Sequence, residues 1–240
     1  DGTPANDYVL TTNINSITTL DVHNENISDL TGIEDFTDLE ILRCEFNNLT
    51  SLDLSYNTDL RQLHCYDNEL TSLDVSINTA LTLLYCYDND LTTLDVSINT
   101  SLTALKVQNN QLTTLDIITN TQLTDLICSN NELTSLDLRN SNNTNLNTFF
   151  AAGNPNLFCI DVDNEVWSTN NWTATGLIPN IDSWTSFSTN CATSLGCTDP
   201  AACNYNGAAV IDDFSCNYDN TGNSTQFACD EYVWNGVTIN

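Results

Sequence analysis

The middle of the chain carries a motif that returns every 21 residues, and one copy reads Leu63-His64-Cys65-Tyr66-Asp67-Asn68-Glu69-Leu70-Thr71-Ser72-Leu73-Asp74-Val75-Ser76-Ile77-Asn78-Thr79. Its asparagine recurs at Asn47, Asn68, Asn89, Asn110 and Asn131, here called the turn asparagines. Its Leu-Asp pair recurs with the same spacing, and the acids are here called the column aspartates: Asp53, Asp74, Asp95, Asp116 and Asp137. A fixed period in this range is typical of a solenoid, in which each copy forms one coil and buries its apolar side chains against the next.

The spacing of Leu60, Leu63, Cys65, Asn68 and Leu70 matches the leucine-rich-repeat pattern. Alternation around Leu63 predicts a short strand that stacks in parallel on its neighbours at about 4.8 Å. The second half of the motif also alternates and lacks helical periodicity. We therefore predict a leucine-rich-repeat solenoid, mainly β and irregular, with a parallel sheet on the concave face and an extended or turn-like convex side.

The repeat pattern divides the chain into five segments. We expect an N-terminal cap with a degenerate first repeat at 1–38 and leucine-rich repeats at 39–157, followed by a C-terminal cap with a disulfide at 158–196. A small Cys-rich module with many Asp and Asn residues follows at 197–219, and 220–240 begins a further β repeat. That last unit lacks a partner strand, so we expect more chain to follow in the natural protein.

Charge excludes two classes of partner. Four Lys and Arg residues against 32 Asp and Glu residues give a formal net charge of −28, which repels nucleic-acid phosphates and anionic lipid surfaces. No apolar run reaches the length of a membrane-spanning helix, so we expect no membrane insertion. The acid excess suits an exported protein, with an unusually acidic cytosolic protein as the alternative.

The ten Cys residues form two groups. Cys44, Cys65, Cys86 and Cys128 share one repeat position that Val107 also occupies, so we expect buried thiols. The other six lie in loop-like sequence and indicate disulfides formed in an oxidising compartment, extracellular or on the outer cell surface. We predict Cys159–Cys191 and prefer Cys197–Cys216 with Cys203–Cys229, although four Cys residues allow three connectivities.

The repeated polar residues have structural explanations. A turn asparagine buried in each coil can hydrogen-bond the backbone of its own and the adjacent coil. Asn57, Asn78, Asn99 and Asn120, here called the corner asparagines, are expected to do the same at the opposite corner. Stacked carboxylates repel each other, and we expect water and hydrogen bonds from nearby Ser, Thr and backbone N–H groups to offset this for the column aspartates. A row of bound Ca²⁺ is the alternative.

The predicted concave face carries a cluster that suits ligand binding. Exposed aromatic rings beside polar groups would contact a glycan or a protein, and the cluster comprises Arg43, His64, Tyr66, Tyr85, Tyr87 and Lys106. The alternative is that these rings only pack against each other across coils. We expect no catalysis, because no Ser or Cys is positioned by the pattern to pair with His64 or His23.

A second candidate site is a Ca²⁺ site inside the loop between Cys197 and Cys216. Its oxygen ligands would be Asp199, Asn204, Asp212 and Asp213. The spacing departs from that of an EF-hand, so a disulfide-closed loop without metal is the alternative.

Several stretches resemble known families. The repeats, with the segment Leu30-Thr31-Gly32-Ile33-Glu34 and the closing 159–173, resemble secreted bacterial leucine-rich-repeat proteins, and that first segment also resembles internalins. The module Gly196-Cys197-Thr198-Asp199-Pro200-Ala201-Ala202-Cys203-Asn204-Tyr205-Asn206 is similar to units in surface proteins exported by the type IX secretion system, often adhesins. Members of that family usually carry Gly where this chain has Phe214.

These resemblances imply export and adhesion. Together with the residues above, they predict a non-enzymatic recognition or adhesion protein that binds a glycan or protein ligand on its concave face. One alternative is a structural spacer or self-assembling unit that contacts other copies of itself. Another is a secretion cargo that is held by components of the secretion machinery.

Overall fold

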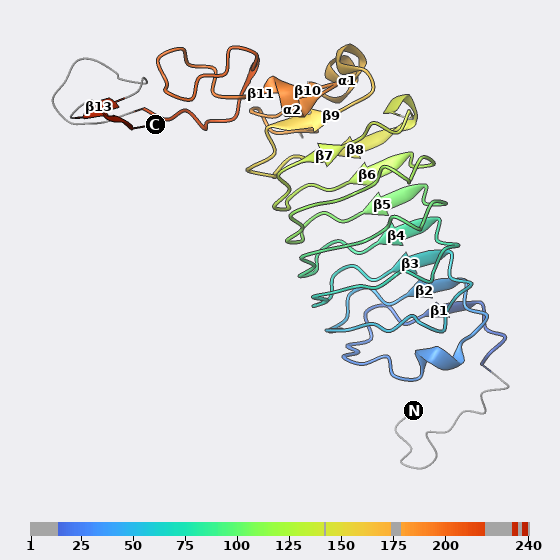
Figure 1. The fold of residues 1–240 in the computed structure, drawn as a ribbon. Coiled ribbons are helices and arrows are strands. Elements are labelled where there is room, and N and C mark those ends of the chain that lie inside the picture. The colour runs from blue at the N-terminus through green and yellow to red at the C-terminus, as the bar shows by residue number, and fades with distance from the viewer. Residues whose placement is uncertain (1–13, 142, 174–178, 219–231, 235–236, 240) are drawn as a thin grey trace.

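The computed structural model describes residues 14–141, 143–173, 179–218, 232–234 and 237–239. The repeats form an elongated, curved solenoid whose strands lie one above the next (Figure 1). Seven strands make one parallel sheet in the order β1-β2-β3-β4-β5-β6-β8. Their bounds are Thr19–Asp21 (β1), Ile41–Arg43 (β2), Gln62–His64 (β3), Leu83–Tyr85 (β4), Ala104–Lys106 (β5), Asp125–Ile127 (β6) and Thr148–Phe150 (β8). The predicted leucine-rich-repeat solenoid is confirmed.

The core consists of columns of equivalent side chains. Leu42, Leu63 and Leu84 pair across successive strands and are fully buried. Cys44, Cys65, Cys86 and Cys128 form a neighbouring column of buried free thiols, as predicted. Burial raises the pKa of Cys44, Cys86 and Cys128 to about 12, so these thiols stay protonated at neutral pH.

Both asparagine series hydrogen-bond the backbone, as predicted, but they do so differently. The side-chain amide of Asn89 donates to the carbonyls of Cys65 in the preceding coil and Cys86 in its own coil, and its Oδ1 accepts from the N–H of Leu70. Each corner asparagine donates twice to the preceding coil, whereas its Oδ1 is buried without a described partner. The turn asparagines are therefore the more completely bonded series.

The convex side is built from turns, as expected. Each column aspartate accepts the backbone N–H two residues ahead at 2.8–3.1 Å, which closes a tight turn. Where Ser occupies that second position, its hydroxyl lowers the pKa of Asp53, Asp74 and Asp95. These bonds favour the hydrogen-bonded explanation of the aspartate series over a row of bound Ca²⁺.

The convex side becomes a sheet only at the C-terminal end of the stack. There β7 (Leu136–Asp137) and β10 (Ser186–Ser188) flank β9 (Cys159–Asp161) in parallel. Arg139 forms ion pairs with Asp137 at 2.7 Å and with Asp161 at 3.3 Å. The last acids of the convex side are thus neutralised by a cation that the earlier coils lack.

Caps close both ends of the hydrophobic stack. The short helix η2 (Ile33–Asp35) lies in the N-terminal coil, and η3 (Asn143–Asn145) precedes β8. Helix α1 (Glu165–Trp172) covers the far end, where Trp172 packs against Phe149 and Phe187 with ring centroids 4.7 and 5.7 Å apart. The predicted Cys159–Cys191 disulfide joins β9 to the short helix α2 (Cys191–Ser194).

A small disulfide-closed module follows this cap. Strands β11 (Leu195–Gly196) and β12 (Ile211–Asp212) pair in parallel, and Cys197 is bonded to Cys216 as preferred. The other preferred pair includes Cys229, which lies outside the described residues. Phe214 has a φ of 57°, a left-handed conformation that Gly adopts more readily than Phe. Strands β13 (Tyr232–Trp234) and β14 (Val237–Ile239) form an antiparallel pair, so the prediction that this last unit lacks a partner strand is wrong.

Candidate functional site

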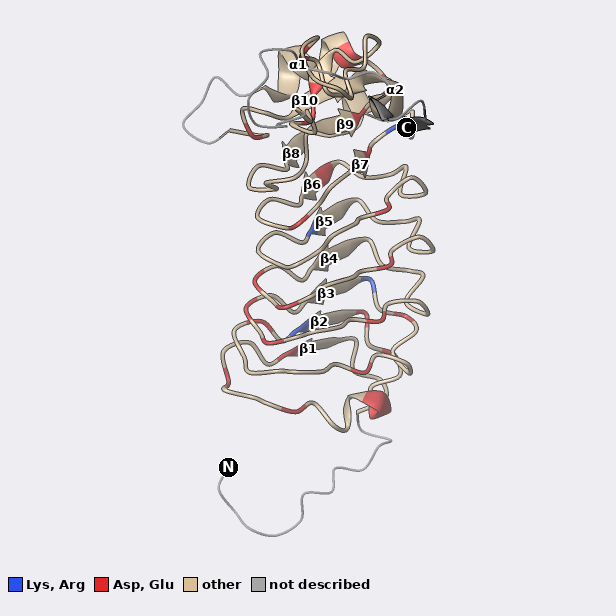
Figure 2. Ribbon diagram, turned by 60° about the vertical axis from the view of Figure 1, so that its left-hand side comes forward, with Lys and Arg blue, Asp and Glu red and all other residues tan. Residues whose placement is uncertain are grey.

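The concave face presents side chains in rows that run along the solenoid. Register aligns Asp21, Arg43, His64, Tyr85, Lys106, Ile127 and Phe150 in one row, because each strand pairs with the next at these positions. Two positions farther along, the next row contains Glu45, Tyr66, Tyr87 and Gln108. Arg43 lies in β2 and Lys106 in β5, and Figure 2 shows basic residues on these strands. The six predicted ligand-binding residues all belong to these two rows.

Three members of the first row contact each other. The His64 ring meets the Tyr85 ring edge-on, with centroids 5.1 Å apart, and the Lys106 ammonium lies 4.3 Å from the centroid of Tyr85. Burial lowers the pKa of His64, so the imidazole is neutral at physiological pH. Arg43 is exposed at the end of β2. The row therefore offers a half-buried aromatic strip with a cation at each end.

The second row centres on two stacked rings. Tyr66 and Tyr87 are parallel, with centroids 4.2 Å apart and an interplanar angle of 10°. The Phe46 ring meets Tyr66 edge-on at 5.2 Å. Burial raises the pKa of both tyrosines. Tyr66 and Tyr87 each use one ring face against the other, so that face of each ring is closed to a ligand.

A third row follows, and its residues share an unusual backbone conformation. Phe46, Asp67, Asp88, Asn109 and Asn130 all adopt left-handed backbone conformations, with φ between 52° and 57°. Side-chain amides link part of the row, because Asn130 donates to Asn109 and Asn109 donates to Asp88, each at 2.7 Å. The Asp67 carboxylate accepts no hydrogen bond from a described residue, and burial together with Asp88 raises its pKa.

Glu45 is the concave residue that the predicted binding cluster omits. Its side chain stands at an outward position between Cys44 and Phe46, yet it is only 6% exposed. Its Oε2 atom is buried and accepts no hydrogen bond from any described residue. Repeat patterns indicate only that a position faces outward, so they do not reveal that this carboxylate is buried.

The predicted Ca²⁺ ligands lie within one module, but their side chains form hydrogen bonds within that module. Asp199 accepts from the Tyr218 hydroxyl and from the N–H of Ala201. The side chain of Asn204 bonds the backbone of 215 and 217, while Asp212 and Asp213 each accept an N–H two residues ahead. Within the described segments, no group of three or more His, Cys, Asp or Glu side chains is placed to hold a metal ion. The calcium site remains a prediction.

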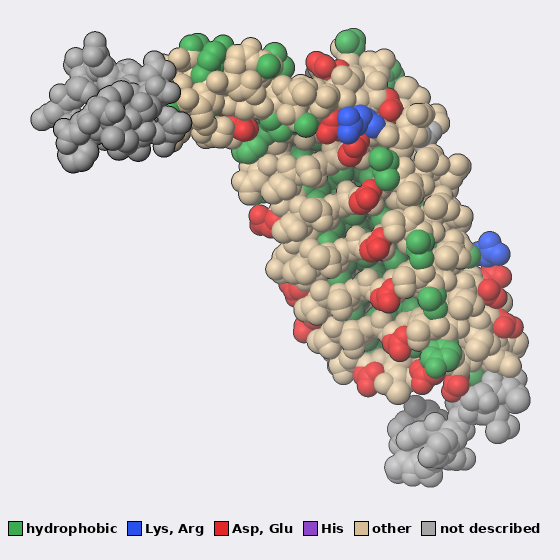
Figure 3. All heavy atoms as spheres, viewed as in Figure 1, with side chains coloured by type: hydrophobic (Ala, Val, Ile, Leu, Met, Phe, Trp, Pro, Cys, Tyr) green, Lys and Arg blue, Asp and Glu red, His purple; other side chains and the backbone are tan. Residues whose placement is uncertain are grey.

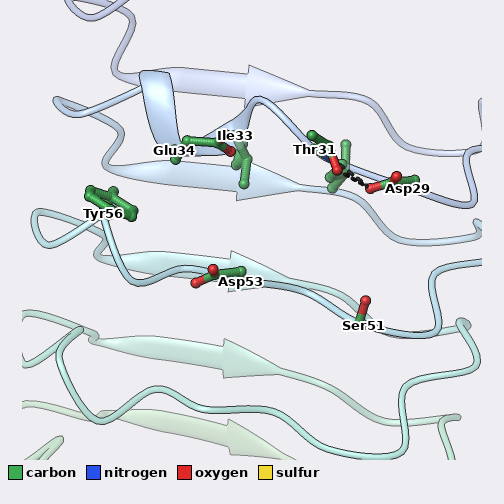
Figure 4. Close-up of a pocket in the computed structure, with 8 residues that line it drawn as sticks. Asp29, Thr31, Ile33, Glu34, Ser51, Asp53 and Tyr56 are labelled. Atoms are coloured by element: carbon green, nitrogen blue, oxygen red, sulfur yellow. Dashed lines mark hydrogen bonds between the residues drawn. The ribbon is translucent and has the colours of Figure 1, made fainter.

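Several surface pockets lie away from the concave face. One, of about 360 Å³, is lined by Asp29, Leu30, Thr31, Ile33, Glu34, Ser51, Asp53 and Tyr56 at the N-terminal end (Figure 4). Its acids are engaged locally: Asp29 accepts from Thr31, and Glu34 accepts from the N–H of Gly32. This pocket brings together none of the predicted site residues.

No protein-family model matches the chain. A stretch of 54 residues is 48% identical to Internalin J of Listeria monocytogenes and spans 22% of this chain but 6% of that protein. None of the helices in the described segments has the length and hydrophobicity needed to span a membrane.

Two solved structures from Listeria monocytogenes extend this comparison. The functional domain of InlJ, which includes a cysteine ladder, matches 78% of this chain and 59% of its own length, with 26% identity and a TM-score of 0.31. The internalin InlF matches 75% of this chain and 50% of its own length, with 20% identity and a TM-score of 0.50. The chain therefore has an internalin-like leucine-rich-repeat fold and spans about half the length of the InlF structure.

Proposed function

We propose that this protein is a non-enzymatic recognition module that acts outside the cell and binds a protein ligand on the concave face of its repeats. The observation that carries the proposal is the cluster of charged and aromatic side chains on an otherwise regular strand surface. Parallel strands hold these side chains in fixed register, and variable concave positions are the usual recognition surface of repeat scaffolds.

The geometry favours a protein over a glycan. A sugar ring commonly packs on an open aromatic face, but Tyr66 and Tyr87 cover each other, and Lys106 and His64 flank Tyr85. The remaining rims, hydroxyls and charges suit side chains of a folded partner. The two disulfides support an extracellular location, because such bonds persist in oxidising compartments.

The environment of His64 supports a role without catalysis. Its Nε2 is buried and forms no hydrogen bond with the described part of the chain. A general base needs a nucleophile within hydrogen-bond distance, whereas the described contact of the His64 ring is the edge-on packing against Tyr85.

The proposal can be tested by screening the full chain against protein and glycan arrays. A Tyr66→Ala, Tyr85→Ala, Tyr87→Ala variant should lose the signal. A matched Tyr56→Ala, Ile77→Ala, Ile98→Ala variant should keep it, because those side chains are exposed outside the sheet rows. Retention of binding by the concave variant would contradict the proposal, and a signal confined to glycans would change the ligand class.

A second candidate is association between copies of the chain. Figure 3 shows exposed hydrophobic side chains running beside a file of acidic ones along the body. The exposed large hydrophobic residues include Tyr56, Ile77, Ile98 and Ile118. Light scattering across a concentration series would test this candidate, with the Tyr56, Ile77 and Ile98 variant expected to remain monomeric. Export by the type IX system remains a prediction that rests on the motif at 196–206.

A further inference from the structure

The carboxylate of Glu45 has a buried oxygen without a described partner. The side chain is 6% exposed, and no Lys, Arg or His of the described chain lies within ion-pair distance of it. A buried carboxylate oxygen without a partner is costly, because water is removed and nothing replaces it. The corner asparagines also bury an oxygen without a described partner, but their amides bond the backbone of the preceding coil, whereas Glu45 is a carboxylate on the concave face. This difference points to a group that arrives from outside.

Other buried atoms on the same surface also lack partners. Besides Glu45 Oε2, they include Nε2 of His64 and Oε1 of Gln108. Oxygen atoms of this kind only accept, and a neutral imidazole nitrogen accepts in one of its tautomers. Asp67 and Asp88 add carboxylates directly after Tyr66 and Tyr87. This part of the concave face therefore presents hydrogen-bond acceptors whose donors must come from another molecule.

The basic side chains of the chain do not meet this need. Arg61 pairs with Glu40, Arg139 pairs with Asp137 and Asp161, and Lys106 lies over Tyr85. Arg43 stands beside Glu45 on the same face, yet no ion pair joins them among the described contacts. With a formal net charge of −28, the molecule as a whole also attracts cations.

We propose that Glu45, Tyr66, Tyr87 and Asp67 form a subsite for a basic side chain, an Arg guanidinium or a Lys ammonium, presented by the protein ligand. The cation pairs with the Glu45 carboxylate and contacts the rims and hydroxyls of the two tyrosines. Guanidinium suits the site well, because its planar array of donors can serve a carboxylate and hydroxyl oxygens together. This inference rests on the proposed function and specifies the chemistry of its ligand.

We expect the ligand to reach the carboxylate through side-chain movement. Arg43, two residues before Glu45, and Phe46, directly after it, are exposed, and Phe46 is 49% exposed. Exposed side chains change rotamer rapidly. The ligand can therefore uncover Glu45 while the strand register stays unchanged.

The test uses the full chain and a small probe. Nα-acetyl-arginine amide is titrated into protein labelled with ¹³C in its aromatic rings, and the Tyr66 and Tyr87 resonances are followed by NMR. Nα-acetyl-citrulline amide, which has a similar shape without the charge, is the control probe. We expect saturable shifts with the arginine compound in the millimolar range and none with the citrulline compound.

Two variants with the same change in charge separate a site from general attraction. Glu45→Gln should weaken binding by at least about fivefold, because it removes the charge partner of the cation. Asp95→Asn, on the exposed convex side, should leave the affinity unchanged. Equal binding of citrulline, equal weakening by both variants, or no shift in the tyrosine resonances would each overturn the subsite.

These outcomes are separate from those for the proposed function. Array binding that is lost in the triple tyrosine variant but unchanged in Glu45→Gln would retain the concave recognition surface and reject the basic side chain. Array binding that survives the triple variant would reject the proposed function itself.

Discussion

The turn asparagines show how one side chain can organise a coil. In Asn89, the amide donates to carbonyls of two coils, and the carbonyl accepts from the backbone of the preceding coil. A side chain with both a donor and an acceptor is needed, and Asp or Leu of similar size lacks one or both. Recurrence of this residue at each copy therefore follows from the hydrogen bonds of a buried turn.

We expect Asn89→Ala to lower the free energy of unfolding by about 3 kcal/mol, because it leaves several buried backbone groups without partners. Asn99→Ala should cost less, about 1–2 kcal/mol, because Asn99 donates two hydrogen bonds while its Oδ1 accepts none. Urea denaturation followed by circular dichroism would measure both. Equal costs would contradict the distinction between the two asparagine series.

Backbone conformation at the third concave row gives a second prediction. Asn109 has a φ of 57°, a region that disfavours residues with a Cβ atom unless they are Asn or Asp. Asn109→Ala should be less stable than Asn109→Gly by about 1 kcal/mol, since both lack the amide and only Ala strains the backbone. The same pair of substitutions at Thr113, an exposed residue outside this row, is the control, and there Gly should have no advantage.

At the scale of elements, the strands are short but their positions were predictable. Each spans about three residues, because only the segment around the buried Leu has neighbours on both sides in register. A strict period places these strands, the thiol column and both asparagine series. The burial of Glu45 and the stacking of Tyr66 on Tyr87 depend on side-chain packing, which a repeat pattern does not describe. The left-handed conformation of Phe46 does follow the period, but Phe itself gives no sequence signal for it.

The sheet formed by β7, β9 and β10 was not predicted either. It appears only where the repeat is interrupted and the cap begins, so the 21-residue period does not predict it. The sheet instead depends on the cap, because β10 belongs to the cap and comes after α1 in the sequence.

The convex turns should make the free energy of unfolding depend on pH in the acidic range. The Ser hydroxyls lower the pKa of Asp53, Asp74 and Asp95 below that of the unfolded chain. Their stabilisation is therefore complete at neutral pH and is lost as the pH falls below about 4, where these acids bind protons in the unfolded chain first.

A Ser55→Ala, Ser76→Ala, Ser97→Ala variant should consequently lose less stability between neutral pH and pH 3 than the natural chain does. Urea midpoints at each pH would measure the difference. The matched control replaces Ser51, Ser72 and Ser135, which are exposed in the same repeats. A pH dependence in the first variant identical to that of the control would refute the assigned cause.

At the scale of the whole molecule, the stack depends on its closed ends. Each coil contacts only its neighbours, so an uncovered end would expose a full layer of core. Trp172 is nearly buried against Phe149, and the adjoining disulfide closes a loop with a sequence separation of 32. The cap is thus stabilised by a disulfide and aromatic packing, whereas the repeats are stabilised by contacts between neighbouring coils.

Replacement of Cys159 and Cys191 by Ser should destabilise the cap by about 3–4 kcal/mol, the loop-closure value for a loop of this length. Tryptophan fluorescence should then change at a lower urea concentration than the circular dichroism of the repeats. Reduction of the natural chain should have the same effect. A single shared transition at the original midpoint would show that the disulfide adds nothing to the cap.

Both asparagine series point the same way along the chain. Asn68 and Asn78 donate to carbonyls of the preceding coil, and beyond the last coil Asn180 of the cap donates to Phe149. A ribosome releases the N-terminal end first. Each coil that emerges therefore supplies asparagine donors to backbone carbonyls of the coil made just before it. Synthesis and assembly therefore run in the same direction, and a molecule interrupted partway is incomplete only at its newest edge.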